Sequence, residues 1–271
     1  MITVTAINSI DDPRISAYRS LKVRPPGKEG LFIVESKPAV NALMESGLRI
    51  ESCLTTQKTY DEFCLRMPRL DDRAISFYIM DKKSIEDVIG FRFHHGIMMA
   101  AHLPEKASAE ETSGSWRSPH LLVALNGIHD PQNVGLIVRN AAAFGADALI
   151  VDPGTHEPFY RKVARISMGS VFNIPVSYEE DLADALKGVK EKYGTRIVVP
   201  SPVTSERDIN ETDLSGNICI VLGNEASGAS ADMMDIADVK VRIPLCFERA
   251  DSLNVACASA VFLHRASLSR F

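Results

Sequence analysis

The chain has 271 residues, of which 45% are hydrophobic and 24% are charged, and its formal net charge is −5. This composition is typical of a globular protein with a sizeable core, and the length suits one large domain or two ordinary ones. The acidic balance excludes a uniformly basic protein that coats nucleic acid, but it is compatible with an enzyme that carries a local basic patch.

No apolar run approaches membrane-spanning length, and the amino terminus lacks the basic and apolar regions of a secretory signal. We therefore expect a cytoplasmic protein. The five cysteines include no CxxC pair, so we expect buried free thiols, such as Cys219 and Cys257, in a reducing compartment. The histidines do not fall at zinc spacings with the cysteines, and we expect no metal site.

Residues 1–105 alternate short strands with short helices, which predicts a small α/β unit. The expected elements are an amphipathic segment at 14–21, strands at 31–35, 50–55, 76–79 and 96–101, and helices at 37–45, 59–67 and 84–89. Residues 106–118 are polar and aperiodic and are expected to form a linker. Its Trp116 is a candidate for packing at the domain junction.

Two stretches of this first unit could contact RNA. One is a basic cluster with few acids nearby, made of Arg14, Arg19, Lys22, Arg24 and Lys28. It suits either phosphate contact or a solvated loop. The other is the run from Phe91 to His95, which mixes aromatic and basic residues as base-stacking surfaces do. For the second stretch, a strand edge with two buried phenylalanines is the favoured alternative.

Residues 119–271 show longer apolar strands separated by helices, which predicts a parallel sheet covered on both faces. The expected strands are 121–125, 148–151, 174–177, 196–199, 218–222 and 239–243, and the expected helices are 134–144, 160–168, 182–192, 231–236 and a final one that carries Leu253, Val255, Ala256 and Ala260. The turn at 130–133 can cap the helix at 134–144.

The last third ends two buried strands in abrupt turns. Residues 218–222 run into Gly223-Asn224-Glu225, and residues 239–243 run into Pro244. Gly223 would let a ligand approach the backbone, and Asp251 or Ser252 could cap the final helix. Crevices beyond the carboxyl ends of strands are where open α/β sheets bind ligands. An ordinary stable core with plain turns is the alternative.

Three stretches carry a family resemblance. They are NGIHDPQNVGLIVRNAAAFG from Asn126, the Gly-Asn-Glu turn at 223–225, and Ile243-Pro244 followed by Ser252-Leu253-Asn254. In this order they resemble the SpoU (TrmH) branch of the SPOUT RNA methyltransferases. The first unit, with its strand ending in Glu35 and its His95-Gly96 strand entry, resembles the ribosomal-protein-like RNA-binding domain of that family. The resemblance implies a C-terminal trefoil knot, a homodimer, an RNA substrate and S-adenosyl-L-methionine as cofactor.

The resemblance also implies a set of site residues. It assigns catalysis or substrate positioning to Arg139, Asn133, Glu225, Ser252 and Asn254, and cofactor binding to Leu222, Gly223, Ile243 and Leu253. Arg139 would act on a ribose 2′-hydroxyl, either as a proton acceptor or by binding phosphate and stabilising an alkoxide. A guanidinium normally stays protonated, which favours the second role. His129 and His156 are candidate bases on residue type alone, but they do not occupy positions that the family assigns.

Two departures bear on activity. Ala226 stands where the family usually has glycine, and the loop 245–251 is one residue longer than usual. The resemblance therefore predicts an RNA 2′-O-ribose methyltransferase, with ribosomal RNA favoured over transfer RNA. The alternatives are an RNA-binding protein that keeps this fold with little or no activity, and a methyltransferase that acts on an RNA base.

Overall fold

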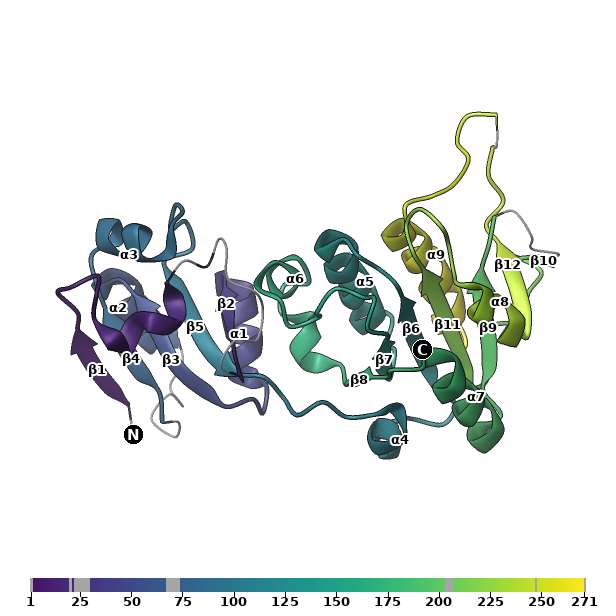
Figure 1. Cartoon of the computed structure of the whole chain (residues 1–271), viewed down its shortest axis with the longest axis horizontal. Helices are drawn as coiled ribbons and strands as arrows, with labels where there is room; N and C mark the ends of the chain where they lie inside the picture. The colour runs from purple at the N-terminus through teal and green to yellow at the C-terminus, as the bar shows by residue number, and fades with distance from the viewer. Residues whose placement is uncertain are drawn as a thin grey trace. The chain divides into compact units, whose positions relative to one another are not determined.

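A computed structural model describes residues 2–19, 21, 30–66, 74–202, 207–246 and 248–270. The chain forms two compact units (Figure 1). The first comprises Met1–Pro104 and Phe159–Phe172, and the second comprises Glu105–Pro158 and Asn173–Phe271. Of the basic cluster predicted near the amino terminus, Lys22, Arg24 and Lys28 lie outside the described residues.

The described part of the first unit contains a mixed five-stranded sheet in the order β1-β4-β3-β5-β2. Its strands are β1 (Thr3–Ala6), β2 (Leu31–Glu35), β3 (Ile50–Thr55), β4 (Ser76–Ile79) and β5 (Ile97–His102). Its helices are η1 (Pro13–Tyr18), α1 (Lys37–Glu45), α2 (Gln57–Arg66) and α3 (Lys82–Ile89). Strand β5 runs antiparallel to both neighbours, and β1, β4 and β3 are parallel. Strand β1 was not predicted, because three of its four side chains are exposed and carry no apolar pattern.

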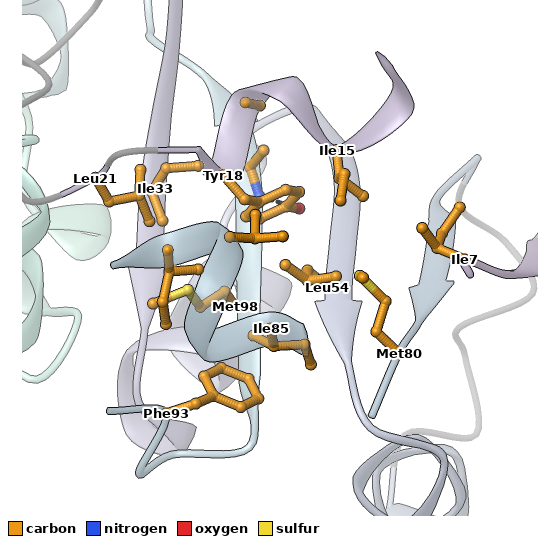
Figure 2. Packing of buried hydrophobic residues seen from close by; sticks show 14 residues of the cluster. Ile7, Ile15, Tyr18, Leu21, Ile33, Leu54, Met80, Ile85, Phe93 and Met98 are labelled. Atoms are coloured by element: carbon orange, nitrogen blue, oxygen red, sulfur yellow. Dashed lines mark hydrogen bonds between the residues drawn. The ribbon is translucent and has the colours of Figure 1, made fainter. Parts of the chain in front are cut away.

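The amphipathic segment predicted at 14–21 covers the core of this unit (Figure 2). Tyr18 is fully buried there, and its hydroxyl lies 2.9 Å from Ser52 Oγ and accepts a hydrogen bond from the Ala100 backbone N–H. Burial raises the pKa of Tyr18 well above its usual range, so the hydroxyl stays neutral. Asp12 caps the segment and pairs with Arg14 at 2.7 Å, so this arginine is held by an intramolecular partner.

The first unit includes a segment that lies between β7 and β8 in the chain. Helix α6 (Arg161–Ile166) and the turn η5 (Ser170–Asn173) carry it. Phe159 and Phe172 pack on Phe32, with ring centroids 5.5 and 5.8 Å away. Arg161 and Arg165 both donate to the buried Glu35 carboxylate, at 2.8 and 3.0 Å. A buried carboxylate needs such partners, which explains why this segment groups with the first unit rather than the second.

In the second unit the described strands form a parallel sheet in the order β10-β12-β9-β11-β6-β7-β8. They are β6 (Leu121–Asn126), β7 (Ala148–Val151), β8 (Val176–Tyr178), β9 (Arg196–Pro200), β10 (Arg207–Asp208), β11 (Ile218–Gly223) and β12 (Val239–Arg242). The helices are α4 (Ala109–Thr112), α5 (Pro131–Ala143), α7 (Leu182–Tyr193), α8 (Ala231–Ile236) and α9 (Val255–Ser267). The predicted α/β class and parallel sheet are confirmed, and the trefoil knot stays a prediction.

Both faces of this sheet are covered, as its continuous apolar strands require. Leu122 and Cys219 face a cluster that includes Leu186 of α7 and Met233 of α8. Helices α5 and α9 pack on each other, and α9, drawn in yellow in Figure 1, lies beside β11. Asn140 of α5 ties the pair by donating to the Ala256 carbonyl and to Ser259 Oγ. These two helices are therefore fixed to each other.

Two expectations about the second unit were wrong. The segment expected as a linker is folded: α4 begins with a capping box at Ser108, and Trp116 packs on His120 and Tyr193 within the unit. The Trp116 ring therefore packs on aromatic side chains of its own unit, which differs from the predicted position at a domain junction. Of the two cysteines expected to be buried, Cys219 is buried but Cys257 is exposed, because it lies on the outward face of α9.

No helix in the described part of the chain combines the length and the apolar character needed to cross a membrane.

Candidate functional site

The site lies where the carboxyl ends of β6 and β11 meet. The strands pair in register up to Gly223 opposite Asn126. Strands β7 and β8 lie on one side of β6, and the later strands lie on its other side in the order β11, β9, β12 and β10. The side on which the chain adds strands therefore changes after β8, and β6 and β11 are the neighbours at this reversal. In open α/β sheets, the crevice beyond such a reversal is where ligands bind. The polar residues after both strands converge at this edge.

One side chain joins the three sequence motifs. Asn133, in the first turn of α5 and 6% exposed, donates from Nδ2 to Glu225 Oε1 at 2.9 Å. Its Oδ1 accepts a hydrogen bond from Asn254 Nδ2, also at 2.9 Å. Asn254 in turn caps α9 by accepting from the backbone N–H groups of Ala256 and Cys257. The predicted residues Asn133, Glu225 and Asn254 are thus brought together in one hydrogen-bonded chain.

The cap of α9 is Asn254 and not Asp251 or Ser252, so capping, which was the alternative role of Asn254, is confirmed for it. The first-helix cap was predicted correctly, since the Asp130 side chain accepts from the Gln132 N–H. Ser252 is exposed, and no hydrogen bond to its side chain occurs among the described residues. It therefore stands beside the network without belonging to it.

Glu225 is held as a carboxylate by several donors. Burial alone would raise the pKa of Glu225, but the hydrogen bonds from Asn133 and from the backbone N–H groups of Asp130 and His129 outweigh it and lower the pKa. The negative charge also lies at the amino terminus of α5, where the helix dipole favours it. The candidate base His129 contributes its backbone N–H to these hydrogen bonds and not its imidazole ring.

The lowered pKa predicts a pH dependence. Ionised Glu225 contributes its full stabilisation above the ordinary value of 4.5 and loses it as the pH falls through the lowered pKa. We expect the difference in the free energy of unfolding between wild type and Glu225→Gln to grow from pH 3 to pH 6 and then level off. Because the side chain is exposed, the plateau should not exceed about 1 kcal/mol. A difference that does not vary with pH would contradict this account.

A second polar network supports the first and was missed in the sequence. Asp152, directly after β7, accepts from Asn126 Nδ2 at 3.0 Å and from the Gly127 N–H at 3.0 Å. Asn126 Oδ1 accepts from the Ser230 N–H, and Asn224 Nδ2 donates to the Gly127 carbonyl. These bonds tie the Gly-Asn-Glu turn to the loop that begins α5. The available signal was position, since Asn126 and Asp152 end neighbouring apolar strands.

The structure explains the glycine at position 223 by a contact within the chain, whereas the sequence suggested the approach of a ligand. A Cβ at this position would lie 2.0 Å from the Ala229 nitrogen and 2.4 Å from the Gly228 carbonyl carbon. Asn224 and Gly228 form a bridge that folds the turn back over the strand end. The close approach that requires glycine is therefore made by the chain itself.

We expect Gly223→Ala to displace the turn that carries Glu225. Overpacking of this kind lowers the free energy of unfolding by about 1–3 kcal/mol. The added Cβ would clash with backbone atoms, which cannot move aside as a flexible side chain can. The expected result is a lower melting temperature together with weaker cofactor binding, measured by calorimetry. Gly188→Ala serves as the control, since nothing lies within 4 Å of its added Cβ. Equal melting temperatures and equal cofactor affinities of the two variants would contradict this expectation, because they would show that the turn accommodates the added methyl group.

On one side of β11, strand pairing stops before two of the residues assigned to the cofactor, Leu222 and Gly223. Strand β9 pairs with β11 only as far as Ile220 and then follows β12. Among the described residues, no strand pairs with that side of Leu222 and Gly223. Leu222 is buried, Ile243 is half-buried after β12, and Leu253 is 39% exposed before α9. Unpaired backbone groups with aliphatic neighbours fit a neutral purine, which needs apolar walls and backbone partners.

Arg139 stands apart from the network. It is exposed on α5, and no hydrogen bond or ion pair to its side chain occurs among the described residues. Six residues along a helix turn by about 600°, so Arg139 and Asn133 point to different sides of α5. The guanidinium is available to a ligand or to another subunit rather than to Glu225. In the altered loop, Cys246, Glu248 and Arg249 are exposed, and Phe247 lies outside the described residues.

Within the described part of the chain, no group of three or more His, Cys, Asp or Glu side chains could hold a metal ion. The polar residues of the site are amides and one carboxylate, which suit hydrogen bonding to a substrate or cofactor.

Comparison with known proteins gives consistent matches. The SpoU rRNA Methylase family matches residues 120–264. A Mycobacterium tuberculosis H37Rv protein named as an uncharacterized tRNA/rRNA methyltransferase is 30% identical, covering 96% of this chain and 90% of its own. The Bacillus subtilis 23S rRNA (guanosine(2553)-2′-O)-methyltransferase RlmP is 26% identical, covering 95% of this chain and 97% of its own.

Two solved structures share the fold. The Sinorhizobium meliloti rRNA methyltransferase with bound AdoMet has a TM-score of 0.79 and 23% identity, and 99% of each chain is covered. AviRb from Streptomyces viridochromogenes in complex with AdoMet has a TM-score of 0.81 and 21% identity, and 96% of this chain and 98% of that one are covered. The family match spans the strands and helices that build the network described above. The chain belongs to the SpoU rRNA methylase family.

Proposed function

We propose that this protein is an AdoMet-dependent RNA 2′-O-ribose methyltransferase that acts on ribosomal RNA. The observation that carries the proposal is the bridge made by Asn133, which links Glu225 and Asn254 at the ligand-binding edge of the sheet. The names of the relatives support the substrate, since RlmP and the RlmB proteins are named as 23S rRNA 2′-O-methyltransferases. The first unit would supply RNA binding.

AdoMet would bind beside the end of β11, where backbone groups of Leu222 and Gly223 and the aliphatic side chains of Ile243 and Leu253 would hold its adenosine. When bound, it supplies a methyl group on a sulfonium, which a ribose 2′-oxygen accepts with loss of its proton. The hydrogen bonds of Asn133 to Glu225 and Asn254 keep the loops at the end of β11 in one arrangement. Such positioning supplies much of the acceleration in a direct transfer.

Arg139 supplies positive charge to the reaction. A guanidinium is a poor proton acceptor, so Arg139 would bind a substrate phosphate and stabilise the developing alkoxide. Because Arg139 points away from Asn133 on α5, we assign it to the site of a second subunit in a homodimer. The site is then complete only when two copies associate.

An apolar stripe on α9 supports the homodimer. Cys257, Val261, His264 and Leu268 are exposed at spacings that place them on one helix face, and Val261 and Leu268 are 39% and 57% exposed. His264 contacts Phe144 at the end of α5, with ring centroids 5.8 Å apart. The stripe therefore continues onto the helix that carries Arg139, and exposed patches of this kind mark interaction sites.

Calorimetry with AdoMet, followed by transfer of a labelled methyl group to rRNA from a strain lacking the gene, tests the proposal. We expect binding with about one cofactor per subunit and incorporation into RNA. A folded protein that binds RNA but not AdoMet would overturn the enzymatic proposal and favour an RNA-binding protein with this fold.

A further inference from the structure

The first unit contains a pocket that no role described so far explains. Its volume is about 450 Å³, within the range of roughly 300–1,000 Å³ that is usual for small-ligand sites. The lining comes from the amino terminus of α1, the loop before β5 and the end of α6. Its residues are Ser36, Lys37, Pro38, His94, His95, Arg165 and Met168.

Ser36 is the first indication of a ligand. It occupies the capping position of α1 but makes no capping hydrogen bond, and it has no other side-chain partner among the described residues. It lines the pocket and is only 6% exposed. The Ser36 hydroxyl oxygen is not among the fully enclosed unpaired atoms of the described residues, so a ligand in the pocket could reach it and supply the partner that the protein does not. Its φ of 82° is a strained value for a residue other than glycine, and such strain concentrates at ligand sites.

The backbone beside Ser36 offers further donors. Among the described residues, no hydrogen bond is made by the N–H groups of Lys37 and Ala39, and Pro38 has none to offer. These groups lie at the positive end of the nine-residue helix α1. Unpaired N–H groups at a helix amino terminus bind anions.

The charges around the pocket favour an anion. Arg165 lines it and shares the Glu35 carboxylate with Arg161, so two guanidinium groups face one carboxylate and leave a net positive charge. Lys37 pairs with Glu62 at 3.4 Å, and both side chains are about half exposed, so this pairing is weak. The exposed His94 and His95 complete a polar rim without adding negative charge.

The position of α6 at the pocket is fixed by close packing. A Cβ on Gly169, which has a φ of 84°, would lie 2.5 Å from Ala42 Cβ and 3.0 Å from Ala39 Cα. The chain after α6 therefore lies directly on α1, and Arg165 and Met168 reach its amino terminus. The segment 159–172 thus contributes two of the residues that line the pocket.

We infer that this pocket binds a backbone phosphate of the RNA substrate, through Ser36, the first N–H groups of α1, Lys37 and Arg165. The identity of the ligand rests on the proposed function, and the site is separate from the methyl-transfer site. Lys and Arg contacts to phosphates give affinity without sequence specificity and position an RNA on the protein. His94 and Met168 lie where a neighbouring nucleotide would pack.

The test compares variants by filter binding to rRNA from a strain lacking the gene, without AdoMet, at salt concentrations from about 50 to 200 mM. We expect Lys37→Ala to weaken binding by about fivefold to tenfold and to reduce the slope of log K against log salt by about 0.7–0.9, which is the effect of one lost phosphate. Lys37→Ala combined with His94→Ala should weaken it further. Lys83→Ala, an exposed lysine on α3, is the matched control and should bind like wild type.

Pocket variants that match the affinity and salt slope of Lys83→Ala, with unchanged melting temperatures, would overturn the inference. The charge reversal Lys37→Glu is a second test. It should weaken RNA binding more than Lys37→Ala does. Because binding is measured without cofactor, an absence of methyl transfer by the wild-type protein would overturn the proposed function and leave this comparison intact.

Discussion

Arg139→Ala should lower kcat/KM for methyl transfer by about 10²–10³-fold while AdoMet affinity and melting temperature stay at wild-type values, because the side chain acts on charge that develops in the reaction. Arg139 is exposed and makes no hydrogen bond within the described part of its own subunit, so its removal leaves no buried group without a partner. The measurement is single-turnover methyl transfer to rRNA. Lys187→Ala, which removes an exposed charge from α7, is the control.

Mixed dimers test whether Arg139 acts across the subunit interface. Arg139→Ala subunits mixed with Asn133→Asp subunits would form some dimers in which one site has an intact Arg139 and an intact Asn133. We expect such a mixture to recover up to about a quarter of wild-type activity, because half the dimers are mixed and one of their two sites is complete. A mixture no more active than its components would contradict action in the partner's site.

Asn133→Asp should be the most damaging conservative change in the network. Aspartate keeps the shape, but when ionised it can only accept hydrogen bonds, so Glu225 loses its side-chain donor and faces a second carboxylate. We expect kcat/KM to fall about 10²-fold through misplaced loops, and the free energy of unfolding to fall by about 1–3 kcal/mol. Denaturant unfolding and methyl transfer measure the two effects.

The pH dependence of unfolding shows why Asn133→Asp is destabilised. A proton shared between the introduced carboxylate and Glu225 restores a donor, so the stability deficit of Asn133→Asp should shrink below about pH 5. Asn41→Asp adds the same charge at an exposed position of α1 and is the control. A deficit that stays constant with pH would show that repulsion between the carboxylates is not its source.

Most elements could be predicted because their boundaries carry chemical signals. Helix α1 matches its predicted limits, since a proline opens it and an apolar stripe runs along it. Strand β7 also matches, because four apolar residues stand between polar turns. The two-residue strand β10 carries no such pattern. The placement of α6 could not be predicted either, because Arg161 meets Glu35 across 126 residues of sequence.

The site was predictable where a family motif marks it. Asn133, Glu225 and Asn254 were identified by resemblance, and the structure joins them through their side chains. Asn126 and Asp152 were missed, although both follow apolar strands at the ligand-binding edge. The reason for Gly223 was also hidden, because the chain that crowds it returns only at Gly228 and Ala229. Such close approaches depend on the folded turn and not on local sequence.

Nucleoside mass spectrometry identifies the methylated atom, if it is applied to rRNA from a strain lacking the gene after incubation with the protein and labelled AdoMet. We expect the wild type to place label on a single nucleotide as a 2′-O-methyl group, and Arg139→Ala to do so about 10²–10³-fold more slowly. Label on a base, or equal ribose methylation by Arg139→Ala, would contradict this expectation.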